Sequence, residues 1–275
     1  MRETCHVCPH KCRIEEGGFG RCGSRKNENG KIICANYGLI TSLALDPIEK
    51  KPLALFYPGS YILSVGSYGC NMSCPFCQNH KIAHPQGSIA VDLRSITCEE
   101  LCDIAIKKTE HGNIGVAYTY NEALTGYEFV RDTAKLVHEH KLKNVLVTNG
   151  MADEEILEEL LPYIDAMNID LKGFTPDIYN RLGGDLETVK KFIVRSAEAC
   201  HVEITSLIVP GFNDSEDDMR REVQWISSIN PDIPLHITRY FPRYKMNQPS
   251  TDIDLMHRLK KIAEEHLDQV FLGNV

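Results

Sequence analysis

Three cysteines, Cys70, Cys74 and Cys77, stand at C-x3-C-x2-C spacing on a short segment that also contains Gly69 and Pro75. Thiolates at this spacing on one tight loop can each bind a different iron of a cubane [4Fe-4S] cluster. Because the loop supplies three ligands, the fourth iron would be open to a small molecule, as a catalytic metal requires. Gly69 permits close approach of the backbone, and Pro75 stiffens the loop. The alternative is a zinc knuckle, but zinc prefers four protein ligands.

A second group of cysteines lies near the N-terminus and consists of Cys5, Cys8, Cys12 and Cys22. Four thiolates close a coordination sphere, which suits structural Zn2+ or an auxiliary [4Fe-4S] cluster, and the sequence leaves both open. His6 or His10 could replace one of the thiolates as a ligand. Without a metal, little would hold this segment folded. We expect Cys98, Cys102 and Cys200, which lie apart from both groups, to be structural.

The composition restricts the partners and the compartment. A net charge of −8 without a basic run gives no field that would attract nucleic acid, so nucleic-acid binding is not expected. No apolar stretch approaches the about eighteen residues of a membrane span, and the N-terminus carries no apolar signal region. We therefore expect a cytoplasmic protein. In that reducing compartment, eleven cysteines indicate metal or redox chemistry rather than a disulfide framework.

From residue 61 onward, apolar β-branched runs alternate with longer helical patterns, which is typical of parallel βα units. We expect strands at Tyr61–Gly66, Ile114–Tyr118, Asn144–Thr148, Ala166–Leu171, Val202–Val209, Leu235–Tyr240 and Val270–Leu272. Thr97 with Glu100 forms a capping box, and Ser215 precedes an acidic first turn, so helices begin there. The alternation predicts an α/β fold with a complete or partial (β/α) barrel at residues 51–275, in which the loops after the strands carry the chemistry. We expect residues 1–50 to form a small Cys-rich, metal-binding N-terminal element.

The loop from Cys70 to Cys77, with an aromatic residue before its last cysteine and a strand leading into it, resembles the C-x3-C-x-aromatic-C signature of the radical S-adenosylmethionine (SAM) superfamily. Within it, the chain resembles the group related to pyruvate formate-lyase activating enzyme, in particular the radical SAM member of the AmmeMemoRadiSam system. The stretches that carry this resemblance are Cys8-Pro9-His10-Lys11-Cys12, Asp46-Pro47-Ile48-Glu49-Lys50-Lys51-Pro52-Leu53, Phe56-Tyr57-Pro58-Gly59-Ser60, Cys77-Gln78-Asn79, Thr119-Tyr120-Asn121-Glu122, Asp170-Leu171-Lys172 and Val209-Pro210-Gly211-Phe212-Asn213-Asp214.

The resemblance implies a partial (β/α)6 TIM-like radical SAM barrel and two cofactors, a [4Fe-4S] cluster and SAM. In such an enzyme the amino and carboxylate groups of SAM chelate the open iron, and the reduced cluster passes one electron to the sulfonium. The products are methionine and a 5'-deoxyadenosyl radical that abstracts a substrate hydrogen, while the protein positions the cofactor and excludes water. The resemblance also implies a flavodoxin or ferredoxin as the reductant.

The resemblance assigns contacts with the cofactor to Phe76, Asn121, Glu122, Thr148, Asn149, Asp170, Lys172 and His236. Glu122 stands where the superfamily usually has the carboxylate of Gly-Gly-Glu, which suits the ammonium of SAM; it could instead stabilise the first turn of a helix. Thr148 and Asn149, followed by a glycine, could form a simple turn. Asp170 and Lys172 face one side of a strand, where they either hold SAM or form a salt bridge. His236 either contacts SAM or packs in the core.

Three functions remain open from the sequence. The first is activation of a partner protein by abstracting hydrogen from a glycine, as glycyl-radical-enzyme activases do. The second directs the same radical chemistry to a small molecule or to another protein or peptide side chain, and the departure from Gly-Gly-Glu at Tyr120-Asn121-Glu122 favours it. The third is a non-catalytic iron-sulfur electron carrier, which would need a fourth ligand for the cluster at Cys70.

Overall fold

One eight-stranded sheet forms the centre of the computed structural model, which describes residues 1–84 and 92–275. Its strand order is β14-β13-β12-β11-β10-β9-β7-β6; neighbours from β7 to β14 run parallel, and β6 is antiparallel to β7. The strands are β6 (Ser42–Pro47), β7 (Tyr61–Gly66), β9 (Asn113–Tyr118), β10 (Lys143–Thr148), β11 (Ala166–Asp170), β12 (His201–Ile208), β13 (Leu235–Arg239) and β14 (Val270–Gly273). Because the strands are parallel and follow chain order, their C-terminal ends all lie at one edge of the sheet.

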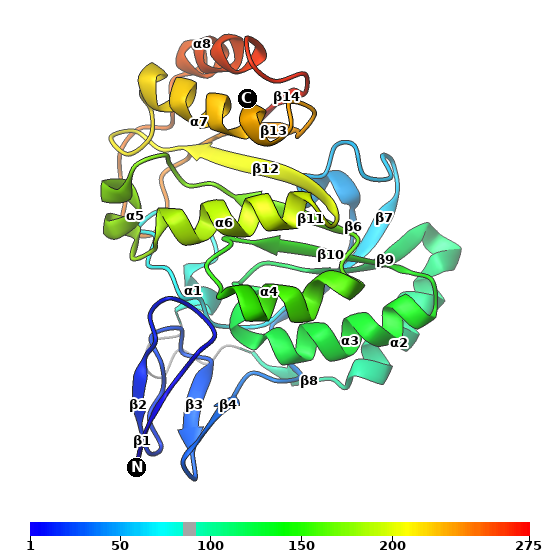
Figure 1. The fold of residues 1–275 in the computed structure, drawn as a ribbon. Helices are drawn as coiled ribbons and strands as arrows, with labels where there is room; N and C mark the ends of the chain where they lie inside the picture. The colour runs from blue at the N-terminus through cyan, green and yellow to red at the C-terminus, as the bar shows by residue number, and fades with distance from the viewer. Residues whose placement is uncertain (85–91) are drawn as a thin grey trace.

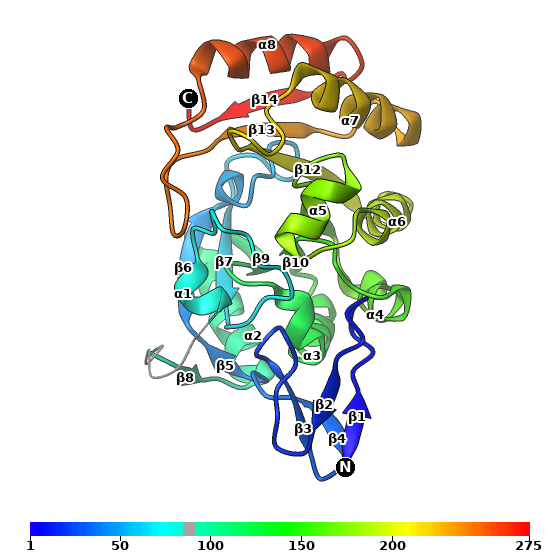
Figure 2. The same cartoon turned by 90° about the vertical axis from the view of Figure 1, so that its left-hand side faces the viewer.

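Helices connect the strands and cover the outside of the sheet, as parallel connections require. They are α1 (His80–Ala83), α2 (Cys98–Lys107), α3 (Tyr127–Glu139), α4 (Glu154–Leu160), α5 (Pro176–Leu182), α6 (Leu186–Ala197), α7 (Glu216–Ile229) and α8 (Ile253–Glu264), with short 3-10 helices at Ile48–Lys50, Lys108–His111, Ala123–Gly126 and Leu161–Tyr163. The capping box at α2 is present, since Thr97 and Glu100 bond each other's backbone N–H groups, and Ser215 caps α7. Neighbouring helices pack in succession along the sheet, α2 on α3, α3 on α4 and α4 on α6 (Figure 2).

The N-terminal residues form short hairpins outside the main sheet. Strand β1 (Arg2–Thr4) pairs with β2 (Arg13–Glu15), and β3 (Arg25–Glu28) pairs with β4 (Lys31–Cys34); β5 (Leu39–Ile40) pairs with β8 (Arg94–Ser95). Figures 1 and 2 show β1 to β4 at the opposite end of the molecule from α8. Burial of apolar side chains in this part is modest, with Val7 and Ile14 among the few buried aliphatic residues before residue 40.

The expected α/β fold with a parallel sheet is confirmed, and each expected strand is present within one or two residues of its expected bounds. The sequence analysis missed β6, which lies before residue 50 and yet is hydrogen bonded to β7 along its whole length. The division into an N-terminal element and a barrel at residue 50 stays a prediction. Because β6 pairs with β7, it would belong to the barrel rather than to the N-terminal element. Over the described ranges, none of the helices combines the length and apolar character needed to cross a membrane.

Candidate active site

A cavity of about 470 Å³ opens where the parallel strands end. Its wall includes the predicted residues Cys70, Cys74, Phe76, Cys77, Asn121, Glu122, Asn149, Asp170 and Lys172. They come from the loops after β7, β9 and β10 and from the end of β11, four consecutive parallel strands. The fold therefore brings together residues that lie up to about a hundred positions apart in the sequence, at the edge where α/β proteins bind their ligands.

The three thiols of the loop after β7 are held in place by backbone donors. Cys70 accepts a hydrogen bond from the N–H of Met72, and Cys77 accepts one from the N–H of Asn79, two residues further on in each case. The side-chain amide of Asn149 also donates to Cys70 Sγ, at 3.7 Å. Burial raises the pKa of all three thiols, that of Cys74 to about 11. Metals bind cysteine as thiolate, so a bound iron would displace these protons.

These residues fit a cluster that is held by three thiolates. Within the described ranges, the cavity wall carries no fourth cysteine and no histidine, so one iron of a cubane would lack a protein ligand. In the described part of the chain, no three His, Cys, Asp or Glu side chains are already placed around a common metal position, either at this loop or at the N-terminal cysteines. Binding iron therefore requires the thiols to turn toward a shared centre.

Glu122 joins the loops after β9 and β10. Its carboxylate accepts hydrogen bonds from Thr148 Oγ1 (2.6 Å) and from the backbone N–H groups of Asn149 (2.8 Å) and Leu124 (3.1 Å). Burial raises the pKa of Glu122, and these donors act in the opposite direction. The bond from Leu124 is an N-cap of the 3-10 helix, which is the structural alternative named above. Thr148 does not line the cavity, so its predicted contact with SAM could only act through Glu122.

Asp170 and Lys172 form an ion pair inside the cavity, with 2.8 Å between Oδ2 and Nζ. Burial alone would lower the pKa of Lys172, but the negative charge of Asp170 outweighs it and raises that pKa. Tyr179 holds the backbone of Lys172 in place, because its hydroxyl oxygen accepts the N–H of Lys172 at 3.2 Å. The cavity thus contains a cation that is fixed in position and stays charged at any physiological pH.

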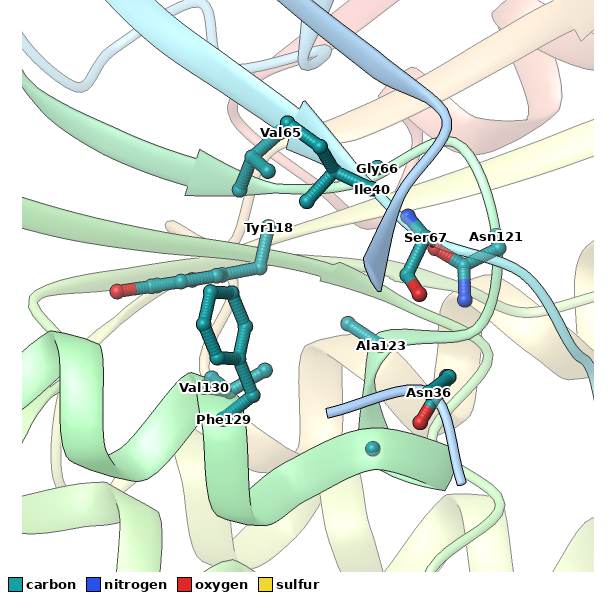
Figure 3. Close-up of a pocket in the computed structure, with 11 residues that line it drawn as sticks. Asn36, Ile40, Val65, Gly66, Ser67, Tyr118, Asn121, Ala123, Phe129 and Val130 are labelled. Carbon is teal, nitrogen blue, oxygen red and sulfur yellow. Dashed lines mark hydrogen bonds between the residues drawn. The ribbon is translucent and has the colours of Figure 1, made fainter. Parts of the chain in front are cut away.

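Asn121 holds the segment that leads into the cysteine loop. Its Oδ1 accepts the N–H of Ser67 at 2.9 Å, and its amide donates to the carbonyls of Tyr68 and Gly69, each at 3.2 Å. Figure 3 shows Asn121 beside Ser67 on the rim of a second cavity, of about 30 Å³, which reaches toward Phe129 on α3. That volume holds about one or two water molecules and no larger ligand. The side-chain polar atoms of Asn121 are thus engaged with the backbone.

His236 is not among the residues that line the cavity, and its contact with SAM stays a prediction. His236 Nε2 is 2.6 Å from Glu203 Oε2, and Glu203 also accepts the N–H groups of Ala54 and Leu55 at 2.8 Å each. Glu203 is the third residue of β12 and His236 the second of β13; His236 pairs in register with Thr205, which lines the cavity. A buried carboxylate needs donors, and His236 supplies one. These bonds and one from His201 lower the pKa of Glu203 to about 2, although burial opposes the shift.

Several residues of the cavity wall were not predicted from the sequence. Arg239, Tyr240, Phe241 and Arg243 follow β13, and Asn274 follows β14. Phe76, which was predicted, packs edge to face on Phe212 with 5.7 Å between ring centres. The position of the Arg239 segment directly after a parallel strand was a usable signal, because every such segment faces the same edge of the sheet.

Comparison with known proteins agrees with this geometry. The model of the radical SAM superfamily matches residues 64–225. The chain is 39% identical to the uncharacterized protein MJ0808 of Methanocaldococcus jannaschii over 280 residues, which cover 98% of this chain and 81% of that protein. It is 28% identical to the pyruvate formate-lyase 1-activating enzyme of Escherichia coli K12 over 163 residues, 56% of this chain and 63% of the enzyme.

Among solved structures, SuiB of Streptococcus suis bound to S-adenosylmethionine superposes with a TM-score of 0.59 at 16% identity, covering 77% of this chain and 51% of SuiB. That likeness concerns the fold alone. The family model, in contrast, spans the strand before the cysteine loop, the loop itself and the strands up to β12. The chain therefore belongs to the radical SAM superfamily, whose members work with a [4Fe-4S] cluster and S-adenosylmethionine.

Proposed function

We propose that this chain binds a [4Fe-4S] cluster through Cys70, Cys74 and Cys77, cleaves SAM there, and activates a partner protein by taking a hydrogen atom from a glycine. The observation that carries the proposal is the shared cavity, in which three thiols face Glu122, Asp170 and Lys172 without a fourth cysteine or histidine in the described wall. When bound, cluster and SAM supply one-electron cleavage of the sulfonium to methionine and a 5'-deoxyadenosyl radical. A flavodoxin or ferredoxin is the reductant we expect.

The residues of the chain hold the cofactor and exclude water. Lys172, fixed by Asp170, presents a permanent positive charge that suits the carboxylate of SAM. Glu122 and Asn149 also line the cavity, and side-chain oxygens of this kind suit its ammonium. Asn121 acts indirectly, because it fixes the backbone just before Cys70. Phe76 supplies apolar wall next to the thiols.

Replacement of one ligand tests the site. After anaerobic reconstitution with iron and sulfide, wild-type protein with SAM and dithionite should release 5'-deoxyadenosine, whereas Cys74→Ala should bind no cluster and release none. Cys200→Ala removes a thiol outside both cysteine groups and serves as the matched control, with unchanged release. Full SAM cleavage by Cys74→Ala would contradict the site. No 5'-deoxyadenosine from the wild type would leave only the electron-carrier function.

The activase role rests on similarity to the pyruvate formate-lyase 1-activating enzyme and needs a test of its own. A candidate partner incubated with the reduced protein and SAM should develop the doublet of a glycyl radical in electron paramagnetic resonance. The expected product is one radical on the partner and 5'-deoxyadenosine in solution. Cleavage of SAM without a radical on any candidate partner would turn the assignment to the second function.

One feature of the cavity favours that second function, radical chemistry on a small molecule or peptide side chain. Arg239 and Arg243 place two guanidinium groups on the wall, next to Phe241, whose side chain is 44% exposed. Such a wall suits an anionic substrate with an apolar portion. In that case Arg243→Gln should lower substrate turnover while leaving the slow cleavage of SAM without substrate unchanged.

A further inference from the structure

Four cysteine side chains line a second, smaller pocket, outside the cavity described above. Cys5, Cys8, Cys12 and Cys22 all line one pocket of about 10 Å³, and Cys5, Cys8 and Cys22 are no more than 9% exposed. They come from the loop between β1 and β2 and from the turn before β3. None of the four is disulfide bonded. A buried cluster of free thiols with so little apolar packing around it needs another source of stability.

Hydrogen bonds to these sulfurs repeat those of the cysteine loop in the cavity. Cys5 accepts the N–H of Val7, and Cys8 accepts the N–H of His10, again two residues further along. The hydroxyl of Ser24 donates to Cys22 Sγ at 3.3 Å. Donors aimed at sulfur stabilise a thiolate more than a thiol, as they do around metal-bound cysteines. Three of the four sulfurs therefore each accept at least one hydrogen bond.

The backbone brings the four cysteines to the wall of one pocket, although their sulfurs are not yet placed around a common metal position. The N–H of Lys11 donates to the carbonyl of Cys8 at 3.1 Å, and Lys11 has φ 43°, so the chain turns sharply between Cys8 and Cys12. The N–H of Cys5 donates to the carbonyl of Cys12 at 2.9 Å, which closes this loop. Cys22 joins from a turn at Gly23, whose φ is 75°. A non-glycine residue at positive φ is uncommon and marks a turn that its surroundings impose.

Positive charge surrounds the pocket. Arg21 and Arg25 both line it, and Arg25 is 2% exposed. Arg25 also forms two bonds of 2.6 Å to the carboxylate of Glu128. Four thiolates around one divalent ion carry a net negative charge, and guanidinium groups that line the same pocket help to offset it.

We propose that Cys5, Cys8, Cys12 and Cys22 bind a single Zn2+ ion in a tetrahedral site. The size of the pocket favours this ion over an auxiliary cluster. About 10 Å³ is near the space of one water molecule, which suits one ion between four sulfurs. The set of four thiolates is the one that structural zinc takes in proteins.

The zinc site also positions the cysteine loop of the active site. The carbonyl of Cys22 accepts the N–H of Cys70 at 3.1 Å, and His10 Nε2 is 2.8 Å from the carbonyl of Asn71. A side chain at Gly69 would meet the Cys22 carbonyl at 2.9 Å, so the two backbones are in close contact. Loss of zinc should therefore loosen the loop that carries Cys70 without removing any of its thiols.

Metal analysis of a variant that cannot hold the active-site cluster tests the proposal by itself. Protein with Cys70→Ala, Cys74→Ala and Cys77→Ala should contain about one zinc per chain and no iron after purification. Exchange with Co2+ should give the intense visible bands of tetrahedral thiolate-bound cobalt. Adding Cys12→Ala should lower zinc and cobalt binding at least tenfold, whereas adding Cys200→Ala should not.

Two outcomes would overturn the proposal. One is a triple variant without any bound metal, and the other is a triple variant that still binds iron with the broad absorption of an iron-sulfur cluster. Both measurements are made on protein without the cysteines of the radical site, so they are independent of the proposed function. If the Cys12 variant does not fold, the metal content of the triple variant alone decides.

Discussion

Tyr120 stands where the superfamily usually has the first glycine of Gly-Gly-Glu, and it keeps the backbone conformation that a glycine would adopt. Its φ is 73°, in the left-handed region, which costs a residue with a side chain about 1–2 kcal/mol. The side chain offsets this cost. Its hydroxyl donates to Asp46 Oδ2 at 2.7 Å, and Lys51 Nζ lies 4.8 Å from the centre of the ring. Burial would raise the pKa of Asp46, but the bonds from Lys51 and Tyr120 lower it.

Removal of the Tyr120 hydroxyl should destabilise the protein. Tyr120→Phe keeps the ring over Lys51 but deletes the donor to a largely buried carboxylate, so the free energy of unfolding should fall by about 1–2 kcal/mol. Urea unfolding followed by circular dichroism measures the change. Tyr37→Phe is the matched control, because the Tyr37 hydroxyl bonds Asp132 at the surface, and it should cost less. Equal losses for both variants would show that the Asp46 contact has no special role.

Residue types and spacing predicted site residues only where those residues lie close together in the sequence, on one loop or one strand. The thiols of the cysteine loop, and Asp170 with Lys172, were found because spacing along one loop or one strand fixes their common side. The bond between His236 and Glu203 was not predicted, because the two residues lie on neighbouring strands and sequence does not show such cross-strand pairs. Arg239 and Arg243 were missed because arginine near a surface loop is common in any protein.

At the scale of elements, hydrophobic periodicity was sufficient for the parallel strands, which are buried on both faces. It failed at β6, where Asp46 and Pro47 interrupt the apolar pattern. β6 is the last strand in the sheet order, and an edge strand tolerates a proline and a charge that a central strand would not. Its pairing with β7 is therefore a property of the folded sheet rather than of its own sequence.

Helix α7 carries an unusual buried acid. Glu222 is 2% exposed and accepts the hydroxyl of Ser206 on β12. Burial raises the pKa of Glu222 from its usual 4.5 to about 8, with the Ser206 bond acting against the shift. At neutral pH the folded protein therefore holds one more proton here than the unfolded chain. Between these two pKa values, stability should fall by about 1.4 kcal/mol for each unit of pH increase.

Glu222→Gln should remove that pH dependence. The amide stays neutral and can still accept the Ser206 hydroxyl, so the variant should match the wild type near pH 4 and exceed its stability by about 4 kcal/mol at pH 8. Thermal unfolding across this pH range measures the difference. Glu216→Gln, on the exposed side of the same helix, should leave the pH profile unchanged. A Glu222→Gln variant that is less stable at pH 8 would refute the neutral form of this acid.

At the scale of the whole molecule, the N-terminal hairpins depend on the barrel for their position. Arg25 on β3 reaches the first turn of α3, where it makes a two-pronged ion pair with Glu128 at 2.6 Å for each bond. Its guanidinium also lies 5.1 Å from the centre of the Tyr127 ring. This buried cation is one of several contacts that fix the hairpins, since Val7 and Ile14 belong to the same hydrophobic core as the barrel and the N–H of Cys70 donates to the carbonyl of Cys22.

Arg25→Met should therefore loosen the N-terminal hairpins from the barrel. The variant leaves Glu128 without its partner in a half-buried place, and we expect the free energy of unfolding to fall by about 3 kcal/mol. Arg2→Met breaks an exposed ion pair with Glu15 on the same hairpins and should cost less than about 1 kcal/mol. A double-mutant cycle with Glu128→Gln isolates the pair.

Because Cys22 contacts Cys70 through the backbone, the Arg25 variant should also retain less iron after reconstitution. If it unfolds like Arg2→Met and keeps its iron, the hairpins are held by other contacts.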